Sequence, residues 1–275
     1  MTRYSRLPRR AAACAALPVL CIVFAGAARV ETGFLDRTII IGGDTCRYEV
    51  YVPAGYSASK AWPLIVSLHG GGRQGTDGIQ PTATDFASHI RNSRASVPAI
   101  VVFPQAQPNT RFMYPEMENL VMAELRRTIA EYHVDTNRIY LQGNSMGGEG
   151  AYRIAYRWPR TFAALVVSSG PVRVDAQIGF PQEIIDMDHK ANPFSAAQDP
   201  YAALAAGIKH LPIWIMHGDS DQVIPIEESR RLVDALKREG AAVHYTEYPG
   251  SSHDGTAATA YKDEALYTWL FAQHR

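Results

Sequence analysis

The chain has 275 residues, of which 47% are hydrophobic and 20% charged, and its 27 basic residues balance its 27 acidic ones. This composition is typical of a globular protein with a sizeable core, and it excludes disordered, collagen-like and coiled-coil chains. Because the chain carries no excess of positive charge, we expect no nucleic-acid partner.

The N-terminus has the pattern of an export signal. Four arginines between positions 3 and 10 form a basic head, and an apolar run extends from Ala11 to Ala28. The small residues Ala25-Gly26-Ala27 suit a signal peptidase. A run of this length also approaches that of a membrane span, so a retained anchor is the alternative. We expect a signal peptide over residues 1–27, a secreted or periplasmic mature protein, and no stable membrane anchor after cleavage.

Cysteine usage is consistent with a mature chain that has no internal disulfide. Cys14 and Cys21 would leave with the signal peptide, so that Cys46 alone would remain. Cys46 lies in a strand-like stretch with no histidine at motif spacing, which favours a buried structural thiol over a nucleophile. We expect the core, rather than disulfides, to stabilise the exported protein.

Residues 28–275 contain no linker or repeat, which predicts a single domain. Two strand-like runs, Arg37 to Ile41 and Cys46 to Val52, surround a glycine turn and predict an antiparallel hairpin. Short continuous apolar runs then follow, as is typical of strands that are buried on both faces. These runs are Pro63 to Leu68, Ala99 to Phe103, Arg138 to Leu141, Ala163 to Val167, Pro212 to Met216 and Ala242 to Tyr245.

Segments with helical spacing separate several of these runs. The clearest is Met117 to His133, with Leu120 and Leu125 on an apolar face and Glu118 and Glu124 on a charged one. Strands that alternate with helices predict an α/β fold, with a mostly parallel sheet covered by helices on both faces. Functional loops of such sheets gather at the carboxyl ends of the strands. The other predicted helices are Glu149 to Trp158, Glu227 to Glu239 and Thr256 to Gln273.

A candidate nucleophile lies between a predicted strand and a predicted helix. Gly143-Asn144-Ser145-Met146-Gly147 matches the G-x-S-x-G pattern of a nucleophile elbow, in which a sharp turn exposes the serine hydroxyl. The N-terminal end of the following helix favours negative charge that develops at this site. Without this context, the same five residues would be an ordinary turn.

A serine nucleophile needs a base and an acid that orients the base, in the chain order acid then histidine. Asp221 follows the predicted strand Pro212 to Met216, and His253 lies in the loop after the next strand. Asp219 shares the first loop, but Val223 and Pro225 are placed to anchor the chain after Asp221. His69 and His217 each precede a glycine at a strand end and are interpreted as packed loop residues. The remaining histidines lie in a strand, at a helix end or in surface and terminal segments, so we predict a triad of Ser145, Asp221 and His253.

Backbone amides that bind the oxyanion complete this chemistry. The run His69-Gly70-Gly71-Gly72 follows a predicted strand, in the position from which such folds contribute one donor. The amide of the residue after the nucleophile contributes the other. We therefore expect the oxyanion hole to consist of the amides of Gly71 and Met146.

Together, these motifs make the chain resemble the α/β-hydrolase superfamily. Within it, the chain is similar to exported serine esterases grouped with polyhydroxybutyrate-depolymerase-like proteins, feruloyl esterases and predicted peptidases. The resemblance covers nearly the whole mature chain and is strongest in Leu68 to Gly72, Arg138 to Gly148, Ile215 to Pro225 and around His253. It implies a carboxylic-ester hydrolase that works through an acyl-enzyme, with a small-molecule or oligomeric ester as substrate and no metal or organic cofactor.

Two segments are expected to form the substrate pocket. One is Gln105 to Glu118, which carries Phe112 and Tyr114, and the other is an insert over about 172–201. We predict substrate contacts from Tyr114 and from Asn144, which precedes the nucleophile. The aromatic residues of the insert, which either line the site or pack the insert down, are Phe180, Phe194 and Tyr201.

No metal site is expected, because the group Asp186, Asp188 and His189 lacks a fourth ligand and is interpreted as a polar loop. The same triad could also serve a serine peptidase or an acyltransferase. A non-catalytic binding protein on a hydrolase fold is a further alternative.

Overall fold

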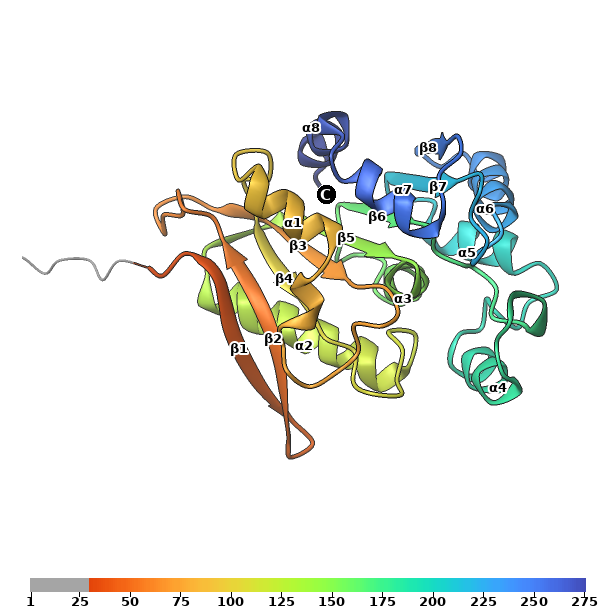
Figure 1. The fold of residues 1–275 in the computed structure, drawn as a ribbon, viewed down its shortest axis with the longest axis horizontal. Helices are drawn as coiled ribbons and strands as arrows, with labels where there is room; N and C mark the ends of the chain where they lie inside the picture. Colours follow the sequence, from red (N-terminus) through yellow and green to blue (C-terminus); the bar gives the residue numbers. More distant parts are fainter. Residues whose placement is uncertain (1–29) are drawn as a thin grey trace, which may run out of the picture.

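The computed structural model describes residues 30–275. The proposed signal peptide and its cleavage point lie outside the described residues. Eight strands form one sheet in the order β1-β2-β4-β3-β5-β6-β7-β8 (Figure 1). The strands are β1 (Gly33–Ile41), β2 (Asp44–Val52), β3 (Trp62–Leu68), β4 (Ile100–Phe103), β5 (Val134–Asn144), β6 (Ala164–Ser168), β7 (Ile213–Gly218) and β8 (Val243–Tyr248).

The sheet is antiparallel at one edge and parallel through the rest. β1 pairs with β2 and β2 with β4 in antiparallel register, whereas every pair from β4 through β3 to β8 is parallel. The predicted hairpin and the predicted mostly parallel sheet are therefore confirmed. In this arrangement β5, β6 and β7 all end at the same edge of the sheet, where the predicted site residues follow.

Helices cover both faces, as predicted from the alternation of elements. The α-helices are α1 (Asp85–Asn92), α2 (Pro115–Glu131), α3 (Met146–Arg157), α4 (Gln182–Ala191), α5 (Pro200–Ile208), α6 (Glu227–Arg238), α7 (His253–Ala260) and α8 (Glu264–Ala272). Two short 3₁₀ turns, η1 (Gln80–Thr82) and η2 (Ala176–Ile178), precede α1 and α4.

The core has two layers because successive strand side chains point to opposite faces. On β3, Leu64 and Val66 pack in one layer with α2, α3, α5 and α6, whereas Ile65 packs in the other with α1, α7 and α8. Cys46 is buried as a free thiol, in agreement with its interpretation as a structural residue.

Several local predictions are wrong in detail. The stretch Thr256 to Gln273 forms two helices, because Asp263 caps a new helix by accepting a hydrogen bond from the amide of Ala265. Helix α1 was not predicted. Glu118 and Glu124 are buried on α2 rather than exposed, and burial raises the pKa of Glu118 to about 7 and that of Glu124 well above its usual value.

The insert contains regular secondary structure that was not predicted from its sequence. It holds η2 and α4 and ends at the start of α5, which Asp199 caps through the amides of Tyr201 and Ala202. The group interpreted as a polar loop, Asp186, Asp188 and His189, lies within α4. Among residues 30–275, no group of side chains is arranged to hold a metal ion, and no helix is long and apolar enough to cross a membrane.

Candidate active site

Ser145 occupies a strained turn between β5 and α3. Its backbone dihedrals are φ 54° and ψ −118°, a region that residues with a side chain rarely adopt. The Ser145 amide donates to the carbonyl oxygen of Ser168 on the neighbouring strand at 2.9 Å. The predicted strand, sharp turn and helix are thus present, and the surrounding hydrogen bonds hold the serine in this conformation.

The two flanking glycines allow the turn to pack tightly. A Cβ at Gly143 would overlap the carbonyl group of Gly147, and a Cβ at Gly147 would overlap the carbonyl group of Leu68 at the end of β3. Any larger residue at either position would force the strand, the turn and the helix apart. Glycine is therefore required at both positions of the G-x-S-x-G pattern, because no side chain fits there.

Three side chains from distant parts of the chain meet at this turn. The His253 Nε2 atom lies 2.8 Å from Ser145 Oγ, and its Nδ1 atom lies 2.7 Å from Asp221 Oδ2. Asp221 follows β7, and His253 is the first residue of α7, which Ser252 caps. His253 is thus at a helix N-terminus rather than within a loop. The geometry fits a hydroxyl, a base and an acid in sequence.

Asp221 is held as a carboxylate. Its Oδ1 atom accepts hydrogen bonds from the amides of Val223 and Ile224, both at 2.9 Å. Burial alone would raise the pKa of Asp221, but these amides and the two histidines His217 and His253 outweigh burial and lower the pKa well below its usual range. The competing Asp219 instead accepts a hydrogen bond from the amide of Gly250 at 2.6 Å.

The glycine loop after β3 lies against Ser145. A Cβ built on Gly70 would lie 3.6 Å from Ser145 Cβ, whereas one on Gly71 would have no atom within 4 Å. Gly71 therefore lies in a part of the loop that has open space beside it. Met146 is the first residue of α3, where amides lack an acceptor within the helix.

His69 fixes this loop as a neutral imidazole. Its Nδ1 atom is 2.7 Å from the Gly70 carbonyl oxygen, and its Nε2 atom is 3.1 Å from the Ala106 amide, which must donate. Nδ1 therefore carries the hydrogen. Burial lowers the pKa of His69 to about 4, so the ring stays neutral near pH 7 and keeps both contacts. The sequence indicated a packed loop residue but not this contact with the glycine loop.

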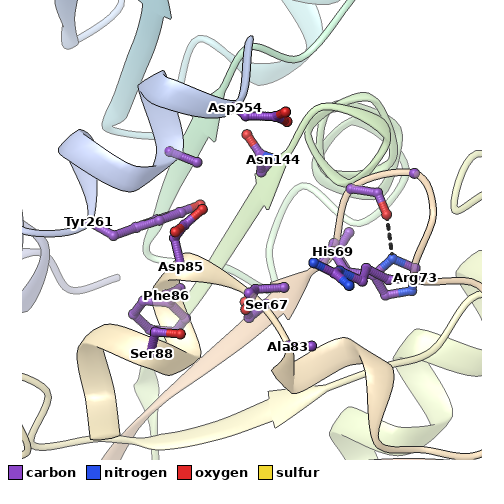
Figure 2. A pocket seen from close by; sticks show the side chains of 15 residues that line it. Ser67, His69, Arg73, Ala83, Asp85, Phe86, Ser88, Asn144, Asp254 and Tyr261 are labelled. Carbon is purple, nitrogen blue, oxygen red and sulfur yellow. Dashed lines mark hydrogen bonds between the residues drawn. The ribbon is translucent and has the colours of Figure 1, made fainter. Parts of the chain in front are cut away.

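A polar hollow of about 230 Å³ lies behind the glycine loop, and Asn144 contributes to its wall. Figure 2 shows Asn144 and Asp254 at one end of this hollow and Phe86 and Ser88 at the other. The hollow adjoins the site but does not include Ser145 or His253 among its lining residues. The Asn144 Oδ1 atom is buried and has no hydrogen-bond partner among the described residues. The Asn144 side chain thus has a buried acceptor without a partner beside Ser145.

The aromatic residues that the sequence offered for the pocket separate into two groups. Phe112, Phe194 and Tyr201 are buried in the main core, and the last two fix the insert against it. Tyr114 and Phe180 instead pack on a small apolar cluster of Met113, Val174 and Ile185, at the contact between the insert and the segment before α2. Tyr114 and Phe180 are therefore the aromatic residues at the border of the two predicted pocket segments.

Helix α3, which begins directly after Ser145, contacts both of these segments. Glu149, in its first turn, pairs with Arg111 from the segment before α2 at 2.6 Å. One turn later, Arg153 pairs with Asp188 of α4 at 2.7 Å, and both side chains are fully buried. This pair was not predicted from the sequence, although the position of Arg153 among the apolar residues of α3 is a possible signal.

Comparison with known proteins agrees with this architecture. The profile of the prolyl oligopeptidase family matches residues 120–274, more than half of the chain and all of the region that holds Ser145, Asp221 and His253. The chain belongs to the prolyl oligopeptidase family.

Relatives of this family member include esterases and peptidases. It is 28% identical to a monoacylglycerol lipase from Mycolicibacterium smegmatis over 46% of this chain and 58% of the lipase. It is 24% identical to dipeptidyl-peptidase 5 from Porphyromonas endodontalis over 83% of this chain and 35% of the peptidase. The chain thus spans less than two thirds of the length of either relative.

Solved structures show the same fold. A thermostable esterase is 28% identical and aligns with a TM-score of 0.70 over 88% of this chain and 63% of that one. A CE1 ferulic acid esterase from the anaerobic fungus Anaeromyces mucronatus is 19% identical, with a TM-score of 0.63 over 90% and 94% of the two chains. This family member accordingly has the α/β-hydrolase fold, and its relatives include esterases.

The buried pair of Arg153 and Asp188 yields a stability prediction. Arg153→Met leaves the Asp188 carboxylate buried and unpaired, which costs about 3 kcal/mol of unfolding free energy. The double variant Arg153→Met/Asp188→Leu should recover most of this loss. Chemical denaturation measures both, with Lys209→Ala at an exposed ion pair as the control that changes stability by less than about 1 kcal/mol. A loss in Arg153→Met as small as in the control would contradict the role of the pair.

Proposed function

We propose that the protein is an exported serine esterase that cleaves carboxylic esters through Ser145, His253 and Asp221. The observation that carries the proposal is the continuous set of hydrogen bonds from Ser145 Oγ through the imidazole of His253 to Asp221 Oδ2. A hydroxyl, an imidazole and a buried carboxylate in this order form the machinery of acyl transfer. The esterase relatives support the same reaction class.

Acylation uses the existing geometry of the three side chains. His253 Nε2 takes the hydroxyl proton as Ser145 Oγ attacks the ester carbonyl carbon, and the carbonyl electron pair moves onto oxygen. The amides of Gly71 and Met146 stabilise that oxyanion. As the tetrahedral intermediate collapses, the bond to the leaving oxygen breaks and His253 protonates the alcohol. Asp221 orients the ring and stabilises its positive charge.

Deacylation repeats these steps with water. His253 removes a proton from water, whose oxygen attacks the acyl carbon, and then returns the proton to Ser145 Oγ as the acid leaves. Each atom and proton is accounted for by the ester, water and three side chains. The proposed cycle involves no metal or organic cofactor.

Substrate contacts are assigned to Tyr114 and Asn144. Tyr114 lies beside the insert, where an aromatic ring can pack against the acyl or alcohol part of an ester. Asn144 directly precedes Ser145 and lines the hollow beside it, so we assign its side-chain amide to contact with a polar group of the substrate.

A serine peptidase with the same triad is the second candidate, and the prolyl oligopeptidase family match together with the similarity to dipeptidyl-peptidase 5 favours it. The two candidates differ in the bond that is cleaved, because amides have a poorer leaving group than esters. Matched substrates with one acyl group therefore separate the candidates.

Hydrolysis of acyl-matched p-nitrophenyl esters and p-nitroanilides tests the proposal. We expect ester turnover to exceed amide turnover, and Ser145→Ala to lower ester turnover by at least about a thousandfold while the melting temperature is preserved. Ser57→Ala, at an exposed loop serine, is the control that should retain full activity. Faster cleavage of amides would favour the peptidase, and full activity in Ser145→Ala would refute the assignment of the nucleophile.

Export is proposed from the basic head, apolar run and small residues before position 28. After expression of the full chain in a Gram-negative host, intact mass of the periplasmic protein is expected to match a chain that begins at Ala28. Full-length protein recovered only with the membrane fraction would contradict cleavage.

A further inference from the structure

Asp221 contacts a second histidine in addition to His253. His217 lies near the end of β7 and is fully buried, with its Nε2 atom 3.2 Å from Asp221 Oδ2. The same oxygen accepts the hydrogen bond from His253. The other ring nitrogen, Nδ1, lies 2.7 Å from the hydroxyl of Ser229, which is buried on α6. Asp221 Oδ2 thus lies within hydrogen-bond distance of two imidazoles.

The partners of His217 determine where its hydrogen lies. Nε2 faces two groups that can only accept, the Asp221 carboxylate and the carbonyl oxygen of Ile224 at 3.0 Å. Nε2 must therefore carry a hydrogen and donate it. Nδ1 faces a hydroxyl, which can donate to an unprotonated ring nitrogen. A neutral ring with its hydrogen on Nε2 satisfies all of these contacts.

We propose that His217 is a positioning residue of the hydrolase site, which donates a hydrogen bond to Asp221 Oδ2 while Ser229 orients its ring. The inference rests on the proposed function of Ser145, His253 and Asp221. It extends the hydrogen-bonded series into α6, so that Ser229, His217, Asp221, His253 and Ser145 follow one another in contact.

The consequence for catalysis concerns the orientation and charge of Asp221. Two amides bind Oδ1, and the two imidazoles bind Oδ2, so the carboxylate is held in one rotational state. Without the His217 donor, Oδ2 can turn away from His253. The negative charge of Asp221 would also be compensated by one hydrogen bond fewer, so Asp221 would stabilise the protonated form of His253 more strongly.

Other charged groups near these residues do not account for such an effect. Glu247 lies opposite His217 on β8, but hydrogen bonds from Arg230 lower the pKa of Glu247 to about 2, so it stays charged across the assay range. Asp219 and Glu227 line a hollow beside Asp221, and Asp254 follows His253. These groups are unchanged in variants of His217.

A matched pair of substitutions separates the proposed role from simple packing. In His217→Gln, the side-chain amide nitrogen reaches about as far as Nε2 and can still donate to Asp221. In His217→Asn, the shorter amide reaches about as far as Nδ1, so contact with Ser229 is possible but the donor to Asp221 is lost. Both variants keep a polar, neutral side chain at the buried position.

The experiment measures kcat, KM and the pH dependence of kcat/KM on p-nitrophenyl acetate, with melting temperature recorded for each variant. For His217→Asn we expect kcat to fall about tenfold, with KM little changed and the acidic limb of the profile moved to higher pH. His217→Gln should restore kcat to within about threefold of the wild type and return the acidic limb of the pH profile to its wild-type position. His89→Asn, at a buried histidine on α1 outside this series, is the control that should leave the profile unmoved.

Two results would overturn the inference. One is wild-type kinetics in His217→Asn, and the other is equal loss in the Asn and Gln variants with an unmoved acidic limb, as expected of a packing residue. If His217→Asn does not fold, Ser229→Ala provides the test, because this substitution removes only the hydroxyl that orients the His217 ring. Lower kcat with a shifted acidic limb supports the inference, and an unchanged profile opposes it. Failure of the proposed function is distinct, because the wild-type protein would then show no ester turnover.

Discussion

The close packing of β3, β5 and α3 around Ser145 is the constraint on which the rest of the site depends. Ser145 can adopt its positive φ only because Gly143 and Gly147 leave room for the carbonyl groups that surround them. The cost of this conformation, typically about 1–3 kcal/mol, is offset by hydrogen bonds to the adjacent strand and by the helix that follows. The same packing places Gly70 against Ser145, so the turn and the glycine loop are packed as one unit.

Helix α3 extends this rigidity to the segments expected to contact the substrate. Glu149 holds Arg111, and Arg153 holds Asp188 of the insert. A second anchor comes from Glu228 on α6, which accepts hydrogen bonds from the amides of Val172 and Arg173 and from the hydroxyl of Tyr201. Both ends of the insert are therefore held by one buried carboxylate. Segments held in this way would present preorganised contacts to a substrate.

Local patterns explain which features could be predicted from the sequence. Continuous apolar runs gave the strands, and the G-x-S-x-G glycines gave the turn at Ser145, because both depend on neighbouring residues. Chain order and strand ends were enough to select Asp221 and His253, which the structure places in contact. The break between α7 and α8 escaped prediction because the short cap at Asp263 interrupts an otherwise continuous helical spacing.

Features that depend on distant residues could not be predicted in this way. Arg153 and Asp188 are 35 positions apart, and nothing in either local sequence specifies the other as its partner. The position of Glu124 in the helical spacing indicates an exposed face of α2, yet its side chain is fully buried. The role of His217 beside Asp221 emerges only when the loop after β7 folds back on its strand.

The central claim, that Ser145 is an activated nucleophile, is tested most directly by reaction with a fluorophosphonate probe followed by peptide mass spectrometry. This measurement requires no knowledge of the substrate. The account predicts stoichiometric modification of Ser145 in the wild-type protein and loss of modification in His253→Ala. Folded protein that remains unlabelled, or that is labelled at another residue, would contradict the account.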